Sequence, residues 1–497
     1  MSVRPEIVII GSGFAGVGMA IQLKKSGFHD FVVLEKNDDL GGTWRDNQYP
    51  GCACDVPSHM YSFSFELNPD WSRMFAPQQE IWDYLRRTVD KYGVGPHVRY
   101  GSAVESLEYE DAARRWRVTT ATGEVYTPRA VVSGIGALHI PSYPDIRGLE
   151  RFAGTAFHSA EWDRSCDLTG KRVAVIGTGA SAIQFVPKVA EQAERVHVFQ
   201  RTAPWIQPKP DFEFPSAFRH VLRRVPGSTR AVRNGIYWLL ESRAAGFAID
   251  PRLSKPMAAL AHKHMARQVP DPELRAALTP DYTIGCKRVL LSSDYYPTLS
   301  RSHVDLVTDG IEEVREHSIV TSDGASGVAG RSHGGETEYE VDVIIYGTGF
   351  KVTDALKEQH IVGRNGTKIQ EAWADGIQAH HGVTIPGFPN FFMLLGPNTG
   401  LGHNSVVFMI EVQIQHILSC LRLLSKHHAD TIEVRPEAAR RYNDRIQRRL
   451  RRAVWSAGGC QSWYLDENGV NRTLWPGFTF EYWAGTRRAR PADYITT

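Results

Sequence analysis

Residues 6–16 read EIVIIGSGFAG, and this stretch decides the fold of the N-terminal part of the chain. The apolar run Glu6–Ile10 predicts a short buried strand, and the glycines after it lead into a helical pattern at Val17–Lys25. A second apolar run, Phe31–Leu34, follows that helix. A strand, a glycine-rich turn, a helix and a second strand form the repeating unit of parallel sheets, so this order predicts an α/β fold.

The three glycines of this turn have the spacing of a dinucleotide-binding site. Gly11 permits the tight turn, Gly13 lets the backbone approach a pyrophosphate, and Gly16 lets the helix pack closely on the strand. The pyrophosphate would then lie at the positive end of the helix. Glu35 ends the next strand, nineteen residues after Gly16, where its carboxylate can accept hydrogen bonds from a ribose diol.

A second turn of the same kind lies about 165 residues further on. GTGASA at 177–182 follows the apolar run Lys171–Ile176, and a helix through about Ala193 leads to a strand at Val196–Phe199. No acid follows this strand. Arg201 stands there instead, and its guanidinium can pair with a 2′-phosphate that an acid would repel. The residues expected to hold this second cofactor are Gly177, Gly179, Ser181, Arg201 and Thr202.

One acidic and one basic dinucleotide fold in the same chain predict FAD and NADPH together, in two Rossmann-like domains. A third apolar run, Val341–Ile345, ends in Gly347-Thr-Gly349. We expect an FAD-binding domain from 1–150 and 342–497, interrupted by an NADP-binding domain at 168–341 and joined to it by a linker at 151–167. A helical insertion is expected at about 212–280, and a surface hairpin loop in the Gly- and Ser-rich stretch 324–335.

Composition limits the class of protein. The 497 residues are 42% hydrophobic, which is enough for two or three domains, and the net charge of +2 offers no bulk attraction to nucleic acid. The N-terminus shows no secretory signal. The most apolar helical stretch, near Tyr237–Ile249, is interrupted by Glu241 and Arg243 and is too short to cross a bilayer. These features predict a soluble, cytoplasmic protein without a membrane span.

Six cysteines are too few for a disulfide framework and favour a reducing compartment. Cys52 and Cys54 are separated by one residue, which does not match the usual redox motif, and we interpret them as small residues beside the flavin. No group of His, Cys and carboxylates has the spacing of a metal site, so no metal is expected.

The connector between the two predicted domains carries a family motif, FAGTAFHSAEWD at 152–163. It resembles in full the fingerprint of the Baeyer–Villiger monooxygenases: Phe, any residue, Gly, three residues, His, three residues, Trp, then Pro or Asp. A second motif of the same family is matched by GGTWRDNQYPGCACD at 41–55. Matching segments continue through YGTGF at 346–350, where alanine is more usual than Gly347, and GPNTGLGHN at 396–404. The fingerprint positions are Phe152, Gly154, His158, Trp162 and Asp163.

The resemblance covers essentially the whole chain and implies a reaction. The family binds FAD tightly and uses NADPH and O2 to convert a ketone into an ester or lactone, through a C4a-peroxyflavin and a Criegee intermediate. Carried over residue by residue, the catalytic arginine falls on Arg288, the acid that orients it on Asp55, and a lysine that contacts the 2′-phosphate on Lys287. A guanidinium stays charged at any working pH, so it can stabilise the anionic peroxide and the Criegee oxyanion.

The same resemblance assigns further residues to cofactor binding. They are Gly42, Thr43 and Trp44 of the second motif, and Trp463, which matches a tryptophan on a loop that contacts the nicotinamide cofactor. His158 belongs to a linker that couples the domains in the family, so a hydrogen-bonding role is expected rather than a general base. Trp162 is expected to pack at that connector.

Three alternatives stay open at this stage. An N- or S-hydroxylating flavin monooxygenase shares both nucleotide folds but usually has Tyr or Phe in place of Trp162. A pyridine-nucleotide disulfide reductase needs a cysteine pair that Cys52 and Cys54 do not supply. A non-catalytic flavin-binding protein would have no use for Arg288. The identity of the small-molecule ketone is open, as is the choice between monomer and homodimer.

Overall fold

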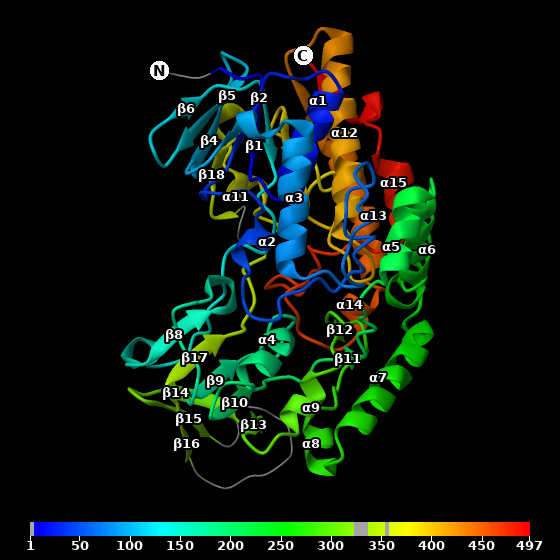
Figure 1. Cartoon of the computed structure of the whole chain (residues 1–497). Coiled ribbons are helices and arrows are strands. Elements are labelled where there is room, and N and C mark those ends of the chain that lie inside the picture. Colours follow the sequence, from blue (N-terminus) through cyan, green and yellow to red (C-terminus); the bar gives the residue numbers. More distant parts are fainter. Residues whose placement is uncertain (1–3, 323–335, 353–356) are drawn as a thin grey trace.

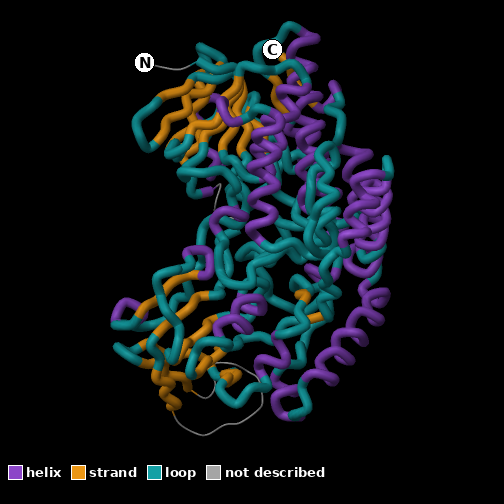
Figure 2. The backbone as a smooth tube through the Cα atoms, viewed as in Figure 1, coloured by secondary structure: helices purple, strands orange, loops and turns teal. Residues whose placement is uncertain are grey.

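The chain forms two lobes, each built around a parallel sheet (Figure 1). The computed structural model describes residues 4–322, 336–352 and 357–497. Figure 2 shows the strands of the two sheets at opposite ends of the molecule, with helices running along the side between them. The predicted α/β class, with two Rossmann-type units, is confirmed. The Gly- and Ser-rich stretch 324–335 lies outside the described residues.

The first sheet contains the strand that precedes the first glycine turn. Its order is β19-β7-β1-β2-β3, and all neighbouring strands are parallel. The strand β1 lies in the middle of this order and is buried along its whole length, which explains why its sequence is continuously apolar. The bounds are β1 Ile7–Ile10, β2 Phe31–Leu34, β3 Val98–Arg99, β7 Ala130–Ser133 and β19 Phe391–Met393.

Helices α1 (Phe14–Lys25), α3 (Gln78–Tyr92) and α12 (Val406–His427) pack together beside this sheet. Of the described helices, α12 is the one that is long and apolar enough to cross a membrane by length and composition. This corrects our expectation that Tyr237–Ile249 is the most apolar helical stretch. Because 61% of its most apolar window is buried and it contacts α1 and α15 (Thr479–Thr486), α12 is a core helix.

The second sheet contains the strand that precedes the second glycine turn. Its order is β13-β10-β9-β17-β8, again with parallel neighbours. The helix α4 (Ala182–Val189) follows the glycine turn and ends earlier than the predicted Ala193. The bounds are β8 Thr155–His158, β9 Arg172–Ile176, β10 Arg195–Phe199, β13 Val304–Val307 and β17 Val343–Tyr346.

Two strands of this sheet lie close to the domain boundaries expected from the sequence. The strand β17 was expected at the start of the returning FAD-binding region, but it pairs with β9. The strand β8 lies in the expected linker and forms the edge of the sheet beside β17. A short buried apolar strand fits any parallel sheet, so the local pattern did not reveal which sheet receives it.

The helical insertion forms the outer edge that joins the two lobes (Figure 1). It contains α5 (Ser216–Arg224), α6 (Ser228–Glu241), α7 (Lys255–Gln268) and α8 (Pro272–Ala277). Buried Arg233 on α6 donates from Nη1 to the carbonyls of His59, Met60 and Ser62 at 2.9–3.1 Å. At the other end, Gln200 after β10 donates to the carbonyl of Ala277 at 2.8 Å. The insertion therefore contacts both lobes.

The remaining elements complete the two lobes. A four-stranded sheet, in the order β18-β4-β5-β6, and a three-stranded sheet, in the order β14-β15-β16, lie beside the parallel sheets. Their bounds are β4 Val104–Glu110, β5 Arg115–Thr120, β6 Val125–Tyr126, β18 His360–Val362, β14 Gly310–Val314, β15 Ser318–Ser322 and β16 Glu336–Glu340. The other elements are α2 Thr43–Asp46, β11 Ile206–Gln207, β12 Leu290–Leu291, α9 Tyr295–Leu299, α11 Ile369–Ala372, β20 Ile432–Val434, α13 Pro436–Leu450, α14 Val454–Ala457, α15 Thr479–Thr486 and β21 Tyr494–Thr496.

Candidate active site

The fold itself requires two of the three glycines in the first turn. Gly11 has φ +91°, and a Cβ there would lie 2.8 Å from the carbonyl oxygen of Gly134. A Cβ on Gly16 would lie 1.8 Å from the carbonyl oxygen of Gly11. Both positions exclude any side chain because the strand, the turn and the helix approach so closely.

Gly13 is different, because nothing in the chain requires a glycine there. Its φ of −76° is ordinary, and the nearest atom to an added Cβ would be the Cα of Gly42, at 3.7 Å. Gly42 belongs to the second family motif and faces Gly13 with no side chain between them. Two facing glycines at the start of α1 leave bare backbone where a pyrophosphate would lie, so this turn fits FAD.

Glu35 is fixed at the end of β2. Its Oε2 accepts hydrogen bonds from the amide of Ser12 at 2.9 Å and the hydroxyl of Ser12 at 2.6 Å, and its Oε1 accepts from the amide of Asn37 at 2.9 Å. The side chain is buried. The carboxylate therefore stands beside the glycine turn in a set orientation, as a ribose-binding acid requires.

The second motif forms α2 and a loop that reaches the other lobe. The indole of Trp44 donates to the hydroxyl of Tyr61 at 3.0 Å, and the hydroxyl of Thr43 accepts from the amide of Asn47 at 3.0 Å. Further along the loop, the amide of Ala53 donates to Gln184 on α4 at 3.0 Å, and Gln184 donates back to the carbonyl of Ala53 at 3.1 Å. Gln184, which the sequence reasoning missed, thus connects the motif to the second glycine turn.

The second turn repeats the arrangement of the first. Gly177 has φ +111°, and a Cβ there would lie 2.5 Å from the carbonyl oxygen of Gly347. Gly179 is again unconstrained, since the nearest atom to an added Cβ is 3.9 Å away. Ser181 is the residue at the N-cap of α4. The open position lies at the start of a helix, so this turn also fits a pyrophosphate.

Basic side chains gather at the end of β10. Arg201 is exposed and follows the strand, and the hydroxyl of Thr178 donates to the carbonyl of neighbouring Thr202 at 3.3 Å. Burial lowers the pKa of Lys287, and the nearby charge of Arg201 lowers it further. Two interacting positive charges favour an anionic ligand at this place, such as a 2′-phosphate.

Arg288 and Asp55 come together from segments 233 residues apart. The Nη2 of Arg288 lies 2.7 Å from Oδ1 and 2.6 Å from Oδ2 of Asp55. The carboxylate raises the pKa of Arg288 above its ordinary value. The Arg288 side chain is partly exposed, at 38%, although its guanidinium is held by Asp55.

Two tyrosine hydroxyls, those of Tyr61 and Tyr464, interact electrostatically with this pair. Tyr464 is buried, and its burial raises its pKa to about 12, with the charge of Arg288 acting in the opposite direction. Trp463 beside it is 46% exposed, and the two rings lie 4.4 Å apart. Sequence reasoning selected Trp463 and missed Tyr464 and Tyr61, because a buried tyrosine in an aromatic-rich chain carries no local signal of function.

The fingerprint segment packs on the second sheet and on α4. His158 is buried, its Nδ1 accepts from the amide of Ala160 at 3.1 Å, and burial lowers its pKa. Trp162 packs against Phe157 and Phe185, with ring centroids 5.1 and 5.4 Å apart. His158 and Trp162 therefore stabilise the packing of the connector segment.

The other fingerprint residues shape the same connector. A Cβ on Gly154 would lie 2.4 Å from the carbonyl oxygen of Asp342 and 2.6 Å from the ring of Phe152, so glycine is required there. The carboxylate of Asp163 accepts from the amide and the hydroxyl of Ser165, at 2.8 and 2.6 Å.

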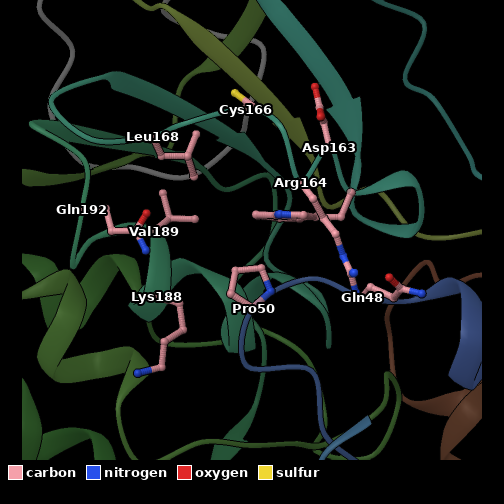
Figure 3. A pocket seen from close by; sticks show the side chains of 10 residues that line it. Gln48, Pro50, Asp163, Arg164, Cys166, Leu168, Lys188, Val189 and Gln192 are labelled. Atoms are coloured by element: carbon pink, nitrogen blue, oxygen red, sulfur yellow. The ribbon is translucent and has the colours of Figure 1, made fainter. Parts of the chain in front are cut away.

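A cleft of about 280 Å³ opens beside Trp162, between the connector, α4 and the second motif (Figure 3). Figure 3 shows Arg164 extending toward Gln48 on one side, with Lys188 and Gln192 of the α4 region on the other. Neither Arg288 nor Asp55 lines this cleft, so it is separate from the Arg288–Asp55 pair.

The cysteines divide into two groups. Cys52 and Cys54 are free and buried, and burial raises the pKa of both thiols, that of Cys52 to about 11. Cys286 and Cys460 form a disulfide across 174 residues, which their separation in the sequence did not reveal. In the part of the chain that the structure describes, no group of His, Cys, Asp and Glu could hold a metal ion.

The two unconstrained glycines give a matched pair of predictions. Gly13→Ala is expected to fold but to bind FAD about ten-fold or more weakly, because the methyl group would occupy the pyrophosphate position. Gly179→Ala is expected to keep its FAD and to raise the KM for NADPH by a similar factor. Flavin absorbance and NADPH titrations measure both. Normal FAD content in Gly13→Ala, or a normal KM in Gly179→Ala, would show that the position does not face a cofactor.

Comparisons with known proteins agree with this geometry. The pyridine nucleotide-disulphide oxidoreductase family matches residues 8–216, which include both glycine turns. A Baeyer-Villiger monooxygenase of Pseudomonas aeruginosa is 47% identical over 99% of this chain and 91% of its own length. A Baeyer-Villiger monooxygenase of Streptomyces coelicolor is 46% identical over 98% of this chain and 92% of its own length.

Solved structures extend the likeness to the whole fold. An oxidized steroid monooxygenase bound to NADP matches with a TM-score of 0.86 and 29% identity over 99% of both chains. Cyclohexanone monooxygenase from Rhodococcus sp. Phi1 bound to NADP+ matches with a TM-score of 0.87 and 26% identity over 100% of both chains. OTEMO in complex with FAD and NADP matches with a TM-score of 0.88 and 27% identity over 100% of both chains.

The fold and the site define a flavoprotein monooxygenase that uses FAD, NADPH and O2. Within this class, the chain belongs to the Baeyer–Villiger monooxygenases. The predicted family, fold, enzyme class and cofactors are confirmed, and the N- or S-hydroxylating and non-catalytic alternatives are set aside.

Proposed function

We propose that Arg288 is the catalytic positive charge of this enzyme and that Asp55 holds it in position. The observation that carries the proposal is the ion pair of Arg288 Nη2 with both carboxylate oxygens of Asp55, in a side chain that is partly exposed. A pre-positioned cation stabilises an oxyanion as its charge develops, without reorganisation during the reaction. Asp55 reduces the cost of keeping that cation in a partly buried site.

The residues that would hold FAD are those of the first turn and the second motif: Gly11, Gly13, Gly16, Glu35, Gly42, Thr43 and Trp44. Bound there, FAD would accept a hydride from NADPH and deliver its electrons to dioxygen. The facing glycines would contact the pyrophosphate through backbone amides, and Glu35 would accept from a ribose hydroxyl.

The residues that would hold NADPH are Gly177, Gly179, Ser181, Arg201, Thr202, Lys287 and Trp463. Support comes from the basic pair, because the charges of Arg201 and Lys287 interact and no acid follows β10. Trp463 is partly exposed on a C-terminal loop and would contact the nicotinamide end.

The lowered pKa of Lys287 gives a pH prediction. The protonated amine attracts a 2′-phosphate, which stays dianionic above about pH 7. As pH rises through the pKa of Lys287, the amine loses its charge, so the Kd for NADP+ is expected to increase. Lys287→Arg should remove this increase, because guanidinium keeps its charge throughout. Titrations of NADP+ from neutral pH to about pH 10 measure the effect. If the Kd for NADP+ depends on pH equally in the parent enzyme and in Lys287→Arg, Lys287 does not bind the 2′-phosphate.

We propose that the substrate is a small-molecule ketone, which becomes an ester or lactone. The named relatives include a steroid monooxygenase and cyclohexanone monooxygenases, so the first panel is a cyclic, an aromatic, a long-chain and a steroid ketone. Ketone-stimulated NADPH oxidation with formation of an ester supports the proposal. NADPH oxidation that no ketone changes, with no ester by mass spectrometry, counts against it.

We further propose the organisation and setting of the enzyme. The FAD-binding region comprises 1–150 and the chain after Tyr346, and the NADP-binding region comprises 168–346 with its helical insertion. The sheet pairing of β17 supports this boundary. We also propose a cytoplasmic location, which the four free thiols support, and an organisation as a monomer or homodimer.

A further inference from the structure

We propose that Cys286 and Cys460 form a redox-controlled tether that holds the loop of Trp463 against the segment of Arg288. Their Cα atoms lie 6.1 Å apart in the disulfide. Cys286 comes directly before Lys287 and Arg288, and Cys460 comes three residues before Trp463. This inference rests on the proposed function, because it gives the tether a role in holding NADP+.

The loop on the Cys460 side has few backbone hydrogen bonds to the rest of the chain, although the side chain of Tyr464 after it is buried. At its start, the amide of Thr283 donates to the carbonyl of Gly458 at 3.1 Å, and at its end Leu465 bridges to Asn471. Among the described residues, no backbone group of 459–463 forms a hydrogen bond with any other segment of the chain. The disulfide is therefore the bond that fixes the middle of this loop.

The segment on the Cys286 side is held firmly. Cys286 is buried, and a Cβ on Gly458 would lie only 2.7 Å from its Cβ. A Cβ on Gly285 would lie 2.6 Å from the ring of Phe247. Because the segment of Cys286 is tightly packed, it is the rigid partner. The disulfide therefore restrains the position of the loop that carries Trp463.

Exposure assigns the two sulfurs their roles in oxidation. Cys460 is half-buried whereas Cys286 is buried, so a peroxide reaches Cys460 first. The Cys460 thiolate attacks one peroxide oxygen, the O–O bond breaks and a sulfenic acid forms, while the departing hydroxide takes up the proton that the thiol had released and becomes water. The thiol of Cys286 then attacks that sulfur, the S–S bond forms and a second water leaves. Two thiols and one hydrogen peroxide thus give one disulfide and two waters, and a dithiol reverses the change.

The consequence concerns retention of the nicotinamide cofactor. With the bond formed, the loop carrying Trp463 stays beside Lys287, and NADP+ is held from both sides. With the bond reduced, the loop must be ordered each time NADP+ binds, and the cost of that ordering weakens binding. Uncoupled NADPH oxidation is therefore expected to rise in the reduced enzyme, because NADP+ leaves before oxygen transfer is complete.

The experiment uses the FAD-containing enzyme after treatment with hydrogen peroxide or with dithiothreitol. Alkylation and mass spectrometry show whether Cys286 and Cys460 are joined, and flavin absorbance changes measure the Kd for NADP+. The Kd is expected to be about five-fold or more higher in the reduced enzyme. Cys460→Ser and Cys286→Ser should show the higher Kd after either treatment. Cys166→Ser, which removes a half-buried free thiol elsewhere, should keep the response of the parent enzyme.

Each result has a distinct meaning. Equal NADP+ affinity in the joined and reduced forms, or alkylation of both cysteines after peroxide treatment, would overturn the tether. A redox-dependent Kd in an enzyme that makes no ester in either form would uphold the tether and count against the proposed function. Retention of the redox response in Cys460→Ser would show that other thiols cause it, and would also overturn the tether.

Discussion

Arg288→Ala is expected to lower the rate of ester formation by about 10²–10³-fold, which is the usual cost of removing one pre-positioned group that stabilises an oxyanion. The loss should appear in kcat more than in the KM for the ketone, because the charge acts on groups that become anionic during the reaction. FAD content should stay normal, since Arg288 lies outside the glycine turn that fits FAD. Product formation is measured by mass spectrometry beside flavin absorbance.

Two conservative variants separate charge from position. Arg288→Lys keeps a positive charge but not the planar fork, so it should recover only part of the rate. Asp55→Asn keeps the size of the orienting side chain and removes its charge, and we expect a smaller loss than in Arg288→Ala. Full activity in Arg288→Ala, or loss of FAD from all three variants alike, would contradict the catalytic assignment.

Removing the positive charge of Arg201 or Lys287 is expected to have the second-largest effect on activity, through the KM for NADPH. Arg201→Ala and Lys287→Ala should each raise the KM for NADPH by about 10–100-fold, because a hydrogen bond to a charged group contributes about 1.5–3 kcal/mol. The KM for NADH should change little, since NADH carries no 2′-phosphate. Steady-state kinetics with both nucleotides therefore measure a switch in preference rather than a general loss of binding.

Arg195 supplies the matched control for that switch. It lies at the start of β10, in the strand that ends before Arg201, and its guanidinium pairs with Asp305 at 2.7–2.8 Å. Arg195→Ala removes an arginine from the same strand and should leave the ratio of the two KM values unchanged. A ratio that shifts equally in Arg195→Ala and Arg201→Ala would mean that general positive charge, and not a phosphate contact, sets the preference.

The elements that local sequence determines were predictable. Each glycine turn lies between a strand and a helix that are adjacent in the chain, so spacing alone predicted both turns and the acid at Glu35. Arg288 and Asp55 lie 233 residues apart, and their pairing was available only through the resemblance to the family. The structure brings these two side chains together as that resemblance implies.

Features that depend on distant contacts were not predictable. The strand β17 joins the second sheet because of its partners β9 and β8, and an apolar strand of four residues does not encode its partners. Gln184 and Tyr464 interact with residues more than a hundred positions away in the sequence. The two cysteines of the Cys286–Cys460 disulfide are separated by 174 positions. A single sequence gives these contacts no periodic or spacing signal.

The most direct test of the proposed ketone oxygenation follows the oxygen atoms of labelled dioxygen into the product. The purified enzyme is given NADPH, ¹⁸O₂ and the best ketone of the panel, and the product is analysed by mass spectrometry while NADPH consumption is followed. We expect an ester or lactone that carries one heavy oxygen atom, with one NADPH consumed for each product molecule. An unlabelled ester, or NADPH oxidation that yields only hydrogen peroxide with every ketone, would contradict it.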